Sequence, residues 1–509
     1  MILPSIVSAF LAFASLFLHP TEAGLRVLAV HTIAAKSHWN FMNGYLHSLT
    51  DAGHNVTVFT WFPDGERENY TENVFKGSMF MALDLVEYLE LLNPINNQMN
   101  FAVHHNRQLC DIIYSNSKIK TLMTAGNTDE FDVIVSETYA SHCMSHLFRR
   151  LRLPLIYLFP SPLPTYLESS CLGQESNPAY VSSLISSFSY PKSFQQRLLN
   201  FLIYKSSKFL LWYFEIRAIK SNPKPYDYIE PVVPSLVFAN SHVIVEPARP
   251  MPPNFIEIGG IHLPEPNAIP NDIREFIENS PNGVIYFTFG STIKMSSFPD
   301  HIKTAFKLAL ARLPQRILWK YESEMEDKPD NVMTRNWFPQ RDILLHPNIK
   351  LFIGHGGISG VFEAVDAGVP MLGFPLFYDQ PRNIANLVDA GMAISLDVMT
   401  VTETQIFESI NKLINDNKYS YNAKLASKRF KDRPMSPAKS AAYWTEYIVR
   451  HNGAPHLKTK AFDLTWYEYY LLDILSLVLV TMSVIGFILY KCLNVICKIV
   501  FFKLKTKTE

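Results

Sequence analysis

The chain from Lys350 to Glu363 reads KLFIGHGGISGVFE and is its most informative stretch. The first five residues are mostly apolar and predict a buried strand, and a helix is expected to begin near Ser359. The two glycines behind His355 leave backbone N–H groups open at the start of that helix, where the helix dipole favours an anion. Glu363 lies one helical turn beyond Ser359 on the same face, so its carboxylate is placed to bind a diol. The segment therefore predicts a phosphate-binding turn, which we call the phosphate turn.

Similar strand and helix units surround this segment. From residue 284 onward, short apolar strands alternate with helical stretches, which predicts a parallel sheet covered on both faces. The expected strands are 284–289, 316–320, 350–354, 371–374 and 392–396, and the expected helices lie near 299–312, 359–367, 380–390 and 402–415.

The amino-terminal half opens in the same way. Strands are expected at 25–31, 55–60, 131–136 and 155–158, with a helix at 39–52, and the aromatic, Ser-rich segment 165–228 is expected to add helices and loops. The Pro-rich stretch 246–253 is interpreted as a linker. We therefore expect an α/β protein of two doubly wound, Rossmann-like domains that face a cleft, where ligands bind at the carboxyl ends of the strands.

The two ends of the chain predict a secretory membrane protein. Residues 1–23 are mostly apolar and end in Thr-Glu-Ala, which favours a signal peptide over a buried first strand. Residues 471–490 carry one charge, Asp473, and are long enough as a helix to cross the ~30 Å hydrocarbon layer. Lysines follow this stretch, so the tail 491–509 is expected in the cytosol and the body in the lumen. The final KTKTE is either an endoplasmic reticulum retrieval signal or a plain stop-transfer flank.

The composition excludes one class of partner. With 46 basic and 46 acidic residues the formal net charge is zero, so no basic field is present to attract nucleic acid. The body contains Cys110, Cys143 and Cys171, which cannot all pair with one another, so neither a disulfide framework nor a zinc site is predicted. Glycosylation sequons begin at Asn55 and Asn69, and Asn69 is the better acceptor because Asn55 lies in an expected buried strand.

Polar residues around the phosphate turn are candidate ligands. His355 can donate a hydrogen bond to a diphosphate oxygen, and Trp337 offers a flat ring on which a base can stack. Asp379 and Gln380 open a helix after a strand, where they can bind sugar hydroxyls. Each residue taken singly has an ordinary structural explanation. The whole candidate set is Ser291, Trp337, Gln340, His355, Gly357, Ser359, Glu363, Asp379 and Gln380.

In combination and order, these residues resemble the signature of the UDP-glycosyltransferase family over residues 337–383. Further family motifs are similar to segments 37–39, 289–291, 451–454 and 463–466, so the resemblance covers essentially the whole chain. It implies a GT-B fold, with an acceptor-binding domain at 24–245 and a UDP-sugar-binding domain at 246–455. A juxtamembrane segment, 456–470, would lead into the membrane helix. Segments 176–180 and 190–199 look more like the invertebrate branch of the family.

His38 is the predicted catalytic base. Glycosyl transfer to a hydroxyl needs a base near the acceptor, and imidazole titrates near neutral pH. His38 follows the first strand and precedes a helix, which places it at the cleft, and the family match supports the role. The family normally has an aspartate after a later strand to orient this histidine. Here Glu137 occupies that place, with His142 and Asp132 as alternatives.

The resemblance implies an inverting transfer of a hexose from a UDP-sugar to hydroxyl groups of small lipophilic acceptors, as in detoxification. Neither a cofactor nor a metal is expected. Glucose is the favoured sugar, because the invertebrate branch mostly uses it, and glucuronic acid is second. The aromatic content of 101–110 and 165–228 favours an acceptor drawn from membrane lipid. The alternative function is a non-catalytic UDP-sugar-binding membrane protein. A structural or adhesion protein with a relict fold would not explain an intact donor signature. Homo-oligomerisation is left open.

Overall fold

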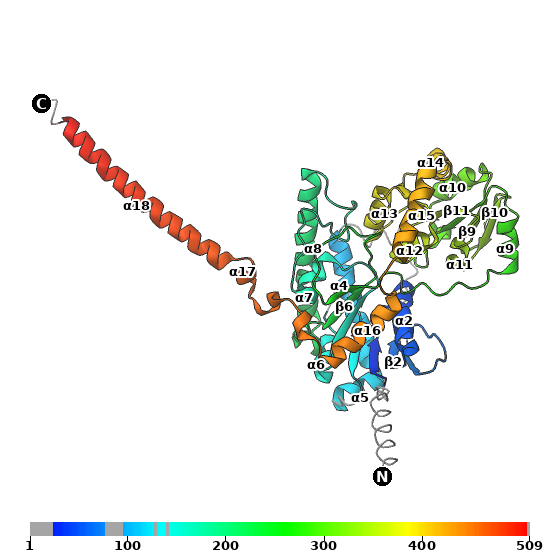
Figure 1. Ribbon diagram of the computed structural model, residues 1–509, viewed down its shortest axis with the longest axis horizontal. Helices are drawn as coiled ribbons and strands as arrows, with labels where there is room; N and C mark the ends of the chain where they lie inside the picture. Colours follow the sequence, from blue (N-terminus) through cyan, green and yellow to red (C-terminus); the bar gives the residue numbers. More distant parts are fainter. Residues whose placement is uncertain (1–23, 77–94, 126–129, 139–141, 506–509) are drawn as a thin grey trace, which may run out of the picture. The chain divides into compact units, whose positions relative to one another are not determined.

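The computed structural model describes residues 24–76, 95–125, 130–138 and 142–505, and the predicted signal peptide lies outside these residues. The chain forms two compact units, Met1–Leu457 and Lys458–Glu509. In the described part of the first unit, two parallel β-sheets carry helices on their faces (Figure 1). This confirms the α/β class with two doubly wound halves.

The first sheet has the strand order β3-β2-β1-β4-β5-β6-β7 among the described residues. Its buried strands β1, β4 and β5 are continuous apolar runs because helices cover both faces. The strands are Arg26–Val30 (β1), Asn55–Thr60 (β2), Tyr70–Val74 (β3), Val133–Ser136 (β4), Leu155–Phe159 (β5), Leu236–Ala239 (β6) and Phe255–Glu257 (β7). The helices of this half are Lys36–Asp51 (α2), Ile95–Ser115 (α4), Ser117–Ala125 (α5), Ser145–Leu151 (α6), Glu168–Leu172 (α7) and Phe194–Ser221 (α8), with 3-10 turns at Thr165–Leu167 (η1) and Pro225–Tyr228 (η2).

The second sheet has the order β10-β9-β8-β11-β12-β13 in the described chain. Its strands are Val284–Thr288 (β8), Arg316–Lys320 (β9), Val332–Arg335 (β10), Ile349–Gly354 (β11), Met371–Gly373 (β12) and Ala393–Ser395 (β13). Figure 1 shows helices gathered around it. They are Asn271–Glu278 (α9), Asp300–Ala311 (α10), Gln340–Leu344 (α11), Ile358–Ala367 (α12), Gln380–Asp389 (α13), Glu403–Asn415 (α14) and Asn417–Lys431 (α15), with a 3-10 turn at Met295–Ser297 (η3).

The chain then returns to the first half. Helix Pro437–Arg450 (α16) packs against α2, where the hydroxyls of Tyr45 and Thr445 are 2.7 Å apart, and the unit ends with the 3-10 turn Pro455–Leu457 (η4). β7 joins the first sheet although it follows the stretch 246–253 that the sequence marks as a linker. The division of the chain into acceptor and donor domains stays a prediction.

Several boundaries differ from the sequence pattern. β3, β6, β7 and β10 are short strands that the sequence pattern does not predict. α2 begins at Lys36, three residues before its expected start, so His38 lies in the first helical turn and not in the loop before it. α8 is one long helix. Its apolar residues show only a weak helical periodicity in the sequence, because apolar side chains such as Phe209 and Trp212 also lie on its exposed face.

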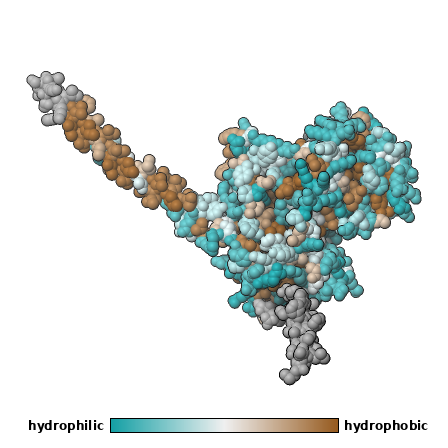
Figure 2. Space-filling model, in the orientation of Figure 1, coloured by the Kyte–Doolittle hydropathy of each residue, from teal (hydrophilic) through white to brown (hydrophobic). Residues whose placement is uncertain are grey.

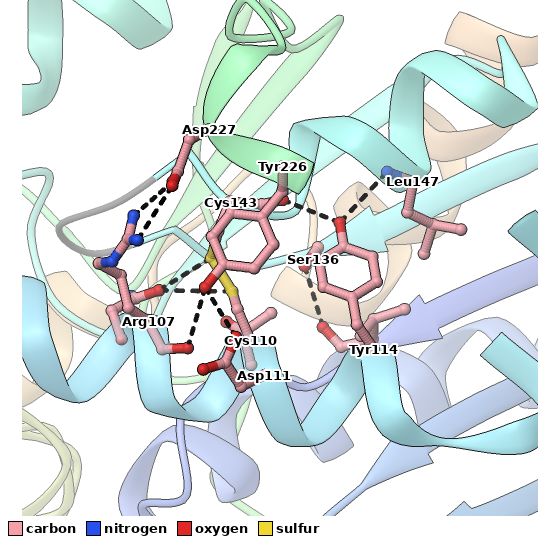
Figure 3. Close-up of a disulfide and its surroundings, with 12 residues drawn as sticks. Arg107, Cys110, Asp111, Tyr114, Ser136, Cys143, Leu147, Tyr226 and Asp227 are labelled. Atoms are coloured by element: carbon pink, nitrogen blue, oxygen red, sulfur yellow. Dashed lines mark hydrogen bonds and ion pairs between the residues drawn. A yellow bond between two sulfur atoms is a disulfide. The ribbon is translucent and has the colours of Figure 1, made fainter. Parts of the chain in front are cut away.

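A disulfide between Cys110 and Cys143 corrects the expectation that the body has none (Figure 3). Three cysteines cannot all pair, but two of them lie 6.4 Å apart at Cα and are bonded, while Cys171 is buried and free. The bridge joins α4 to the segment just before α6, where Tyr114 also donates a hydrogen bond to Cys143 O at 2.8 Å. The pairing depends on how α4 packs, which cysteine spacing does not show.

The second unit contains one long apolar helix. After short turns at Lys460–Asp463 (η5) and Trp466–Tyr469 (α17), α18 runs from Leu472 to Lys505. Figure 2 shows hydrophobic residues along its length, and the stretch Leu472–Phe501 is long and apolar enough to cross a membrane. This stretch of 30 residues is longer than the ~20 that a bilayer needs. It also continues past residue 490, where the expected span ends. The helix is compatible with a membrane anchor.

Candidate active site

One cavity of about 390 Å³ is lined by loops from both sheets of the first unit. All the residues that the sequence predicts for the base, its partner and the ligand site line this cavity. They are His38, Glu137, Ser291, Trp337, Gln340, His355, Gly357, Ser359, Glu363, Asp379 and Gln380. The structure brings them to one place, and their individual roles stay predictions.

The cavity lies where the strand order of each sheet reverses. In the first sheet β1 stands between β2 and β4, and Glu137 directly follows β4. In the second sheet β8 stands between β9 and β11, and His355 directly follows β11. Loops that leave the carboxyl ends of such neighbouring strands diverge, and the crevice between them is where ligands bind in doubly wound sheets.

His38 and Glu137 form a hydrogen-bonded pair on the cavity wall. His38 Nδ1 is 3.0 Å from Glu137 Oε2, and the N–H of Ile33 donates to Glu137 Oε1 at 3.0 Å. With Nδ1–H donating to the carboxylate, His38 Nε2 keeps its lone pair and can accept a proton. A general base oriented by a carboxylate has this arrangement.

Glu137 is held as an anion although its side chain is almost fully buried. Burial alone would raise the pKa of Glu137, but His38, His31 and the Ile33 N–H outweigh it, and the pKa is lowered. The other two candidate partners of His38 lie elsewhere. Asp132 pairs with Arg26 at 2.7 Å, and His142 lines a separate small cavity. The geometry favours Glu137.

His355 fits between two glycines in the second half of the cavity. A Cβ at Gly290 or at Gly357 would come within 2.7 or 2.6 Å of its ring, so only glycine leaves room for the imidazole. Gly290 also has a φ of 78°, which a side chain would strain. Burial, with Lys320 nearby, lowers the pKa of His355 to about 4. The ring is therefore neutral at pH 7 and has one N–H that it can donate to a ligand.

The first turn of α12 adds further donors. The N–H of Val361 reaches Gly357 O at 3.1 Å, which closes the first helical turn. The N–H groups of Ile358, Ser359 and Gly360 precede it and have no acceptor within the helix. Together with the dipole of this ten-residue helix they can bind an anion.

Gln340 and Glu363 contact each other beside this site. Gln340 Nε2 donates to Glu363 Oε2, and burial raises the pKa of Glu363 to about 7. Trp337 is 64% exposed at the cavity, with Lys320 Nζ 5.9 Å from its ring centre. The exposed indole can stack against a planar base, and the amide–carboxylate pair can bind a diol.

Asp379 and Gln380 are fixed by the chain around them. Gln380 Oε1 accepts hydrogen bonds from the N–H groups of Leu376 and Phe377 at 2.9 and 3.3 Å, so its NH₂ is the end that remains for a ligand. Asp379 accepts from Asn383 Nδ2 at 2.8 Å, and burial raises the pKa of Asp379 to about 6. Both side chains are positioned before any ligand arrives.

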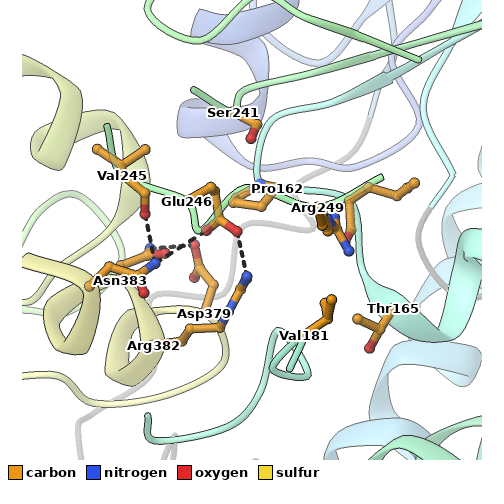
Figure 4. Close-up of polar contacts among 12 residues, drawn as sticks. Pro162, Thr165, Val181, Ser241, Val245, Glu246, Arg249, Asp379, Arg382 and Asn383 are labelled. Carbon is orange, nitrogen blue, oxygen red and sulfur yellow. Dashed lines mark hydrogen bonds and ion pairs between the residues drawn. The ribbon is translucent and has the colours of Figure 1, made fainter. Parts of the chain in front are cut away.

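Helix α13, which carries these two residues, is anchored to the first half of the unit. Glu246 pairs with the buried Arg382 of α13 (Figure 4). Asn386 Nδ2 of the same helix donates to Val245 O at 2.6 Å. Residues in or beside the cavity that the sequence analysis does not single out include His31 beside Glu137, Lys320 at the end of β9 and Tyr378 before Asp379. Of these, only Lys320 has a signal, its place at the carboxyl end of an expected strand.

The two predicted glycosylation positions are both at the surface. Asn69 is exposed just before β3, and Asn55, the first residue of β2, is exposed as well. The expectation that the strand buries Asn55 is therefore wrong, because the residue lies at the strand's end. Glycosylation at either residue stays a prediction.

Comparison with known proteins accounts for this constellation. The family model described as "UDP-glucoronosyl and UDP-glucosyl transferase" matches residues 26–508. The chain belongs to the UDP-glycosyltransferase family. This UDP-glycosyltransferase is 39% identical to UDP-glucosyltransferase 2 of Dactylopius coccus, with 93% of each chain covered. It is 31% identical to UDP-glucuronosyltransferase 2B13 of Oryctolagus cuniculus, with 90% of each covered. The resemblance seen in the sequence is confirmed.

Solved structures share the fold of this UDP-glycosyltransferase at low identity. The glycosyltransferase VinC, solved in complex with DTDP, aligns with a TM-score of 0.55 and 15% identity and covers 84% of this chain and 100% of its own. Spinosyn forosaminyltransferase SpnP aligns with a TM-score of 0.53 and 18% identity, and the alignment covers 84% of this chain and 99% of SpnP. These neighbours confirm the GT-B architecture.

Proposed function

We propose that this UDP-glycosyltransferase moves a hexose from a UDP-sugar to a hydroxyl group of small lipophilic acceptors, with inversion at the anomeric carbon. The observation that carries the proposal is the His38–Glu137 pair, which lines the same cavity as the phosphate turn at His355. A base and an anion site on one cavity are what a single displacement at carbon requires.

Each group has one task in this displacement. His38 Nε2 takes the hydroxyl proton while the acceptor oxygen attacks the anomeric carbon and the bond to UDP breaks. Glu137 keeps the imidazole oriented and stabilises the imidazolium that forms. The diphosphate leaves toward His355 and the open N–H groups of α12, which stabilise its growing charge. One displacement of this kind inverts the anomeric centre.

Glucose is the sugar that we favour, with glucuronic acid second. The relative at 39% identity is named a glucosyltransferase, whereas the glucuronosyltransferase of rabbit is at 31%. The Asp379 carboxylate and the free NH₂ of Gln380 offer an acceptor and a donor for sugar hydroxyls.

The wall of the cavity opposite the donor residues supports a lipophilic acceptor. α4 lines it with Phe101 and Leu109, and Phe159 at the end of β5 and Pro160 directly after it add to this wall. The proposed role is conjugation of such molecules, as in detoxification.

The proposed location is the endoplasmic reticulum membrane, with the body in the lumen. The disulfide Cys110–Cys143 supports it, because such bonds persist in oxidising compartments. The apolar helix α18 is the proposed anchor.

A direct assay tests the proposal. Microsomes containing the full chain are incubated with labelled UDP-glucose or UDP-glucuronate and a panel of phenols and lipid alcohols. We expect transfer from UDP-glucose to give β-linked products. Binding of UDP-glucose without transfer to any acceptor would favour the non-catalytic UDP-sugar-binding protein instead.

Donor binding is expected to depend on pH through Glu363. Its pKa of about 7 means that the carboxylate forms as pH rises from 6 to 8, and the ionised form accepts both hydrogen bonds from a ribose diol. Affinity for UDP-glucose should therefore increase with pH, by up to about tenfold per unit below the pKa. Calorimetry measures it, and Glu363→Gln should bind with no such slope. The same slope in that variant would exclude Glu363 as its source.

A further inference from the structure

His31 is a buried histidine that the proposed reaction does not yet use. It directly follows β1, its side chain is 0% exposed, and it lies against the rings of Trp39 and Phe62. A polar ring in such surroundings is costly unless it makes a hydrogen bond. Neither ring nitrogen makes a hydrogen bond among the described residues.

The Glu137 carboxylate lies within reach of the ring. His31 Nε2 is 3.4 Å from Glu137 Oε1, the oxygen that also receives the Ile33 N–H, while Oε2 faces His38. Burial lowers the pKa of His31 to about 4, so the ring is neutral at working pH and can donate one N–H.

We propose that His31 is a positioning residue: its neutral ring donates Nε2–H to Glu137 Oε1 and so keeps Oε2 turned toward His38. This rests on the proposed role of the His38–Glu137 pair. A carboxylate held by donors on one oxygen cannot rotate away from the imidazole on the other. The short side chain of the aspartate that the family normally has would not need this support as much, whereas glutamate has one more rotatable bond.

The charged groups around the pair are few. Lys36 and His38 of α2 and Glu137 after β4 act on His31, and His38 and His31 act on Glu137. Asp379 of the opposite half interacts electrostatically with His38. Loss of the His31 donor leaves Glu137 more basic, so that the carboxylate attracts a protonated His38 imidazole more strongly.

Three variants of the full chain test the proposal. His31→Phe keeps a ring and removes the donor, His31→Gln keeps an N–H near the position of Nε2, and His31→Asn places its N–H near Nδ1, away from Glu137. We expect His31→Phe and His31→Asn to lower kcat about tenfold, the value of one hydrogen bond to a charged group, with KM for UDP-glucose unchanged. The acid limb of kcat/KM should move to higher pH, and His31→Gln should restore both. His242→Phe, which removes a half-buried imidazole far from Glu137 in sequence and outside the cavity, is the control.

Two outcomes would overturn the proposal. One is a wild-type kcat and acid limb in His31→Phe. The other, which applies if that variant does not fold, is equal activity of His31→Gln and His31→Asn. An NMR titration of His38 reports on the contact between His31 and Glu137 without turnover. It therefore tests the positioning role of His31 even if no acceptor is converted. His38 titrating alike in the wild type and the donor-free variants would also reject the role, whereas absent transfer by the wild type would reject only the proposed reaction.

Discussion

Replacing His38 with alanine is expected to lower kcat for hydroxyl acceptors by at least ~10²-fold, the lower end of what a general base contributes. His105 of α4 also lines the cavity, but among the described residues the lining imidazole that is hydrogen-bonded to Glu137 is that of His38, so His38 is the expected acceptor of the hydroxyl proton. Steady-state rates with labelled UDP-glucose and a phenol measure the effect. UDP affinity should not change, because the donor residues belong to the second sheet.

The control for this variant comes from the same helix. His47 of α2 lies 2.7 Å from Asp64 and outside the cavity, so His47→Ala should keep the wild-type rate. Equal turnover by His38→Ala and the wild type would remove His38 from the mechanism. If Glu137 orients the imidazole, Glu137→Gln should also be slow, because an amide can hold the wrong tautomer of His38.

Replacing His355 with alanine is expected to lower kcat/KM for UDP-glucose by about 10²–10³, the range seen when one preorganised donor to a developing anion is lost. The ring is neutral and packed against Gly290 and Gly357, so its N–H is held in place before the donor binds. Part of the loss should appear as weaker binding of UDP, since the product carries the same diphosphate. Calorimetry with UDP and steady-state rates separate the two contributions.

An exposed histidine of the same half serves as the comparison. His301 on α10 faces solvent, and His301→Ala should bind UDP as the wild type does. Wild-type affinity and rate in His355→Ala would show that the phosphate turn does not hold the diphosphate, and the assignment of the cavity's second half would fail with it.

The donor half of the site could be predicted because its geometry is local. The end of β11, the glycines and the first turn of α12 lie within fourteen consecutive positions, and helix pitch alone places Glu363 one turn below Ser359. The same holds for α18, since length and apolar composition are enough to recognise a helix that can cross a membrane.

The catalytic half depended on the tertiary structure. His38 and Glu137 are 99 residues apart, and they meet because β1 and β4 are neighbours at the point where the strand order reverses. Composition gave no sign that His31 would lie behind that pair, or that Cys110 and Cys143 would be close enough to bond. Periodicity specifies which residues share one face of one element, whereas contacts between distant segments require the order of the strands and the packing of helices over them.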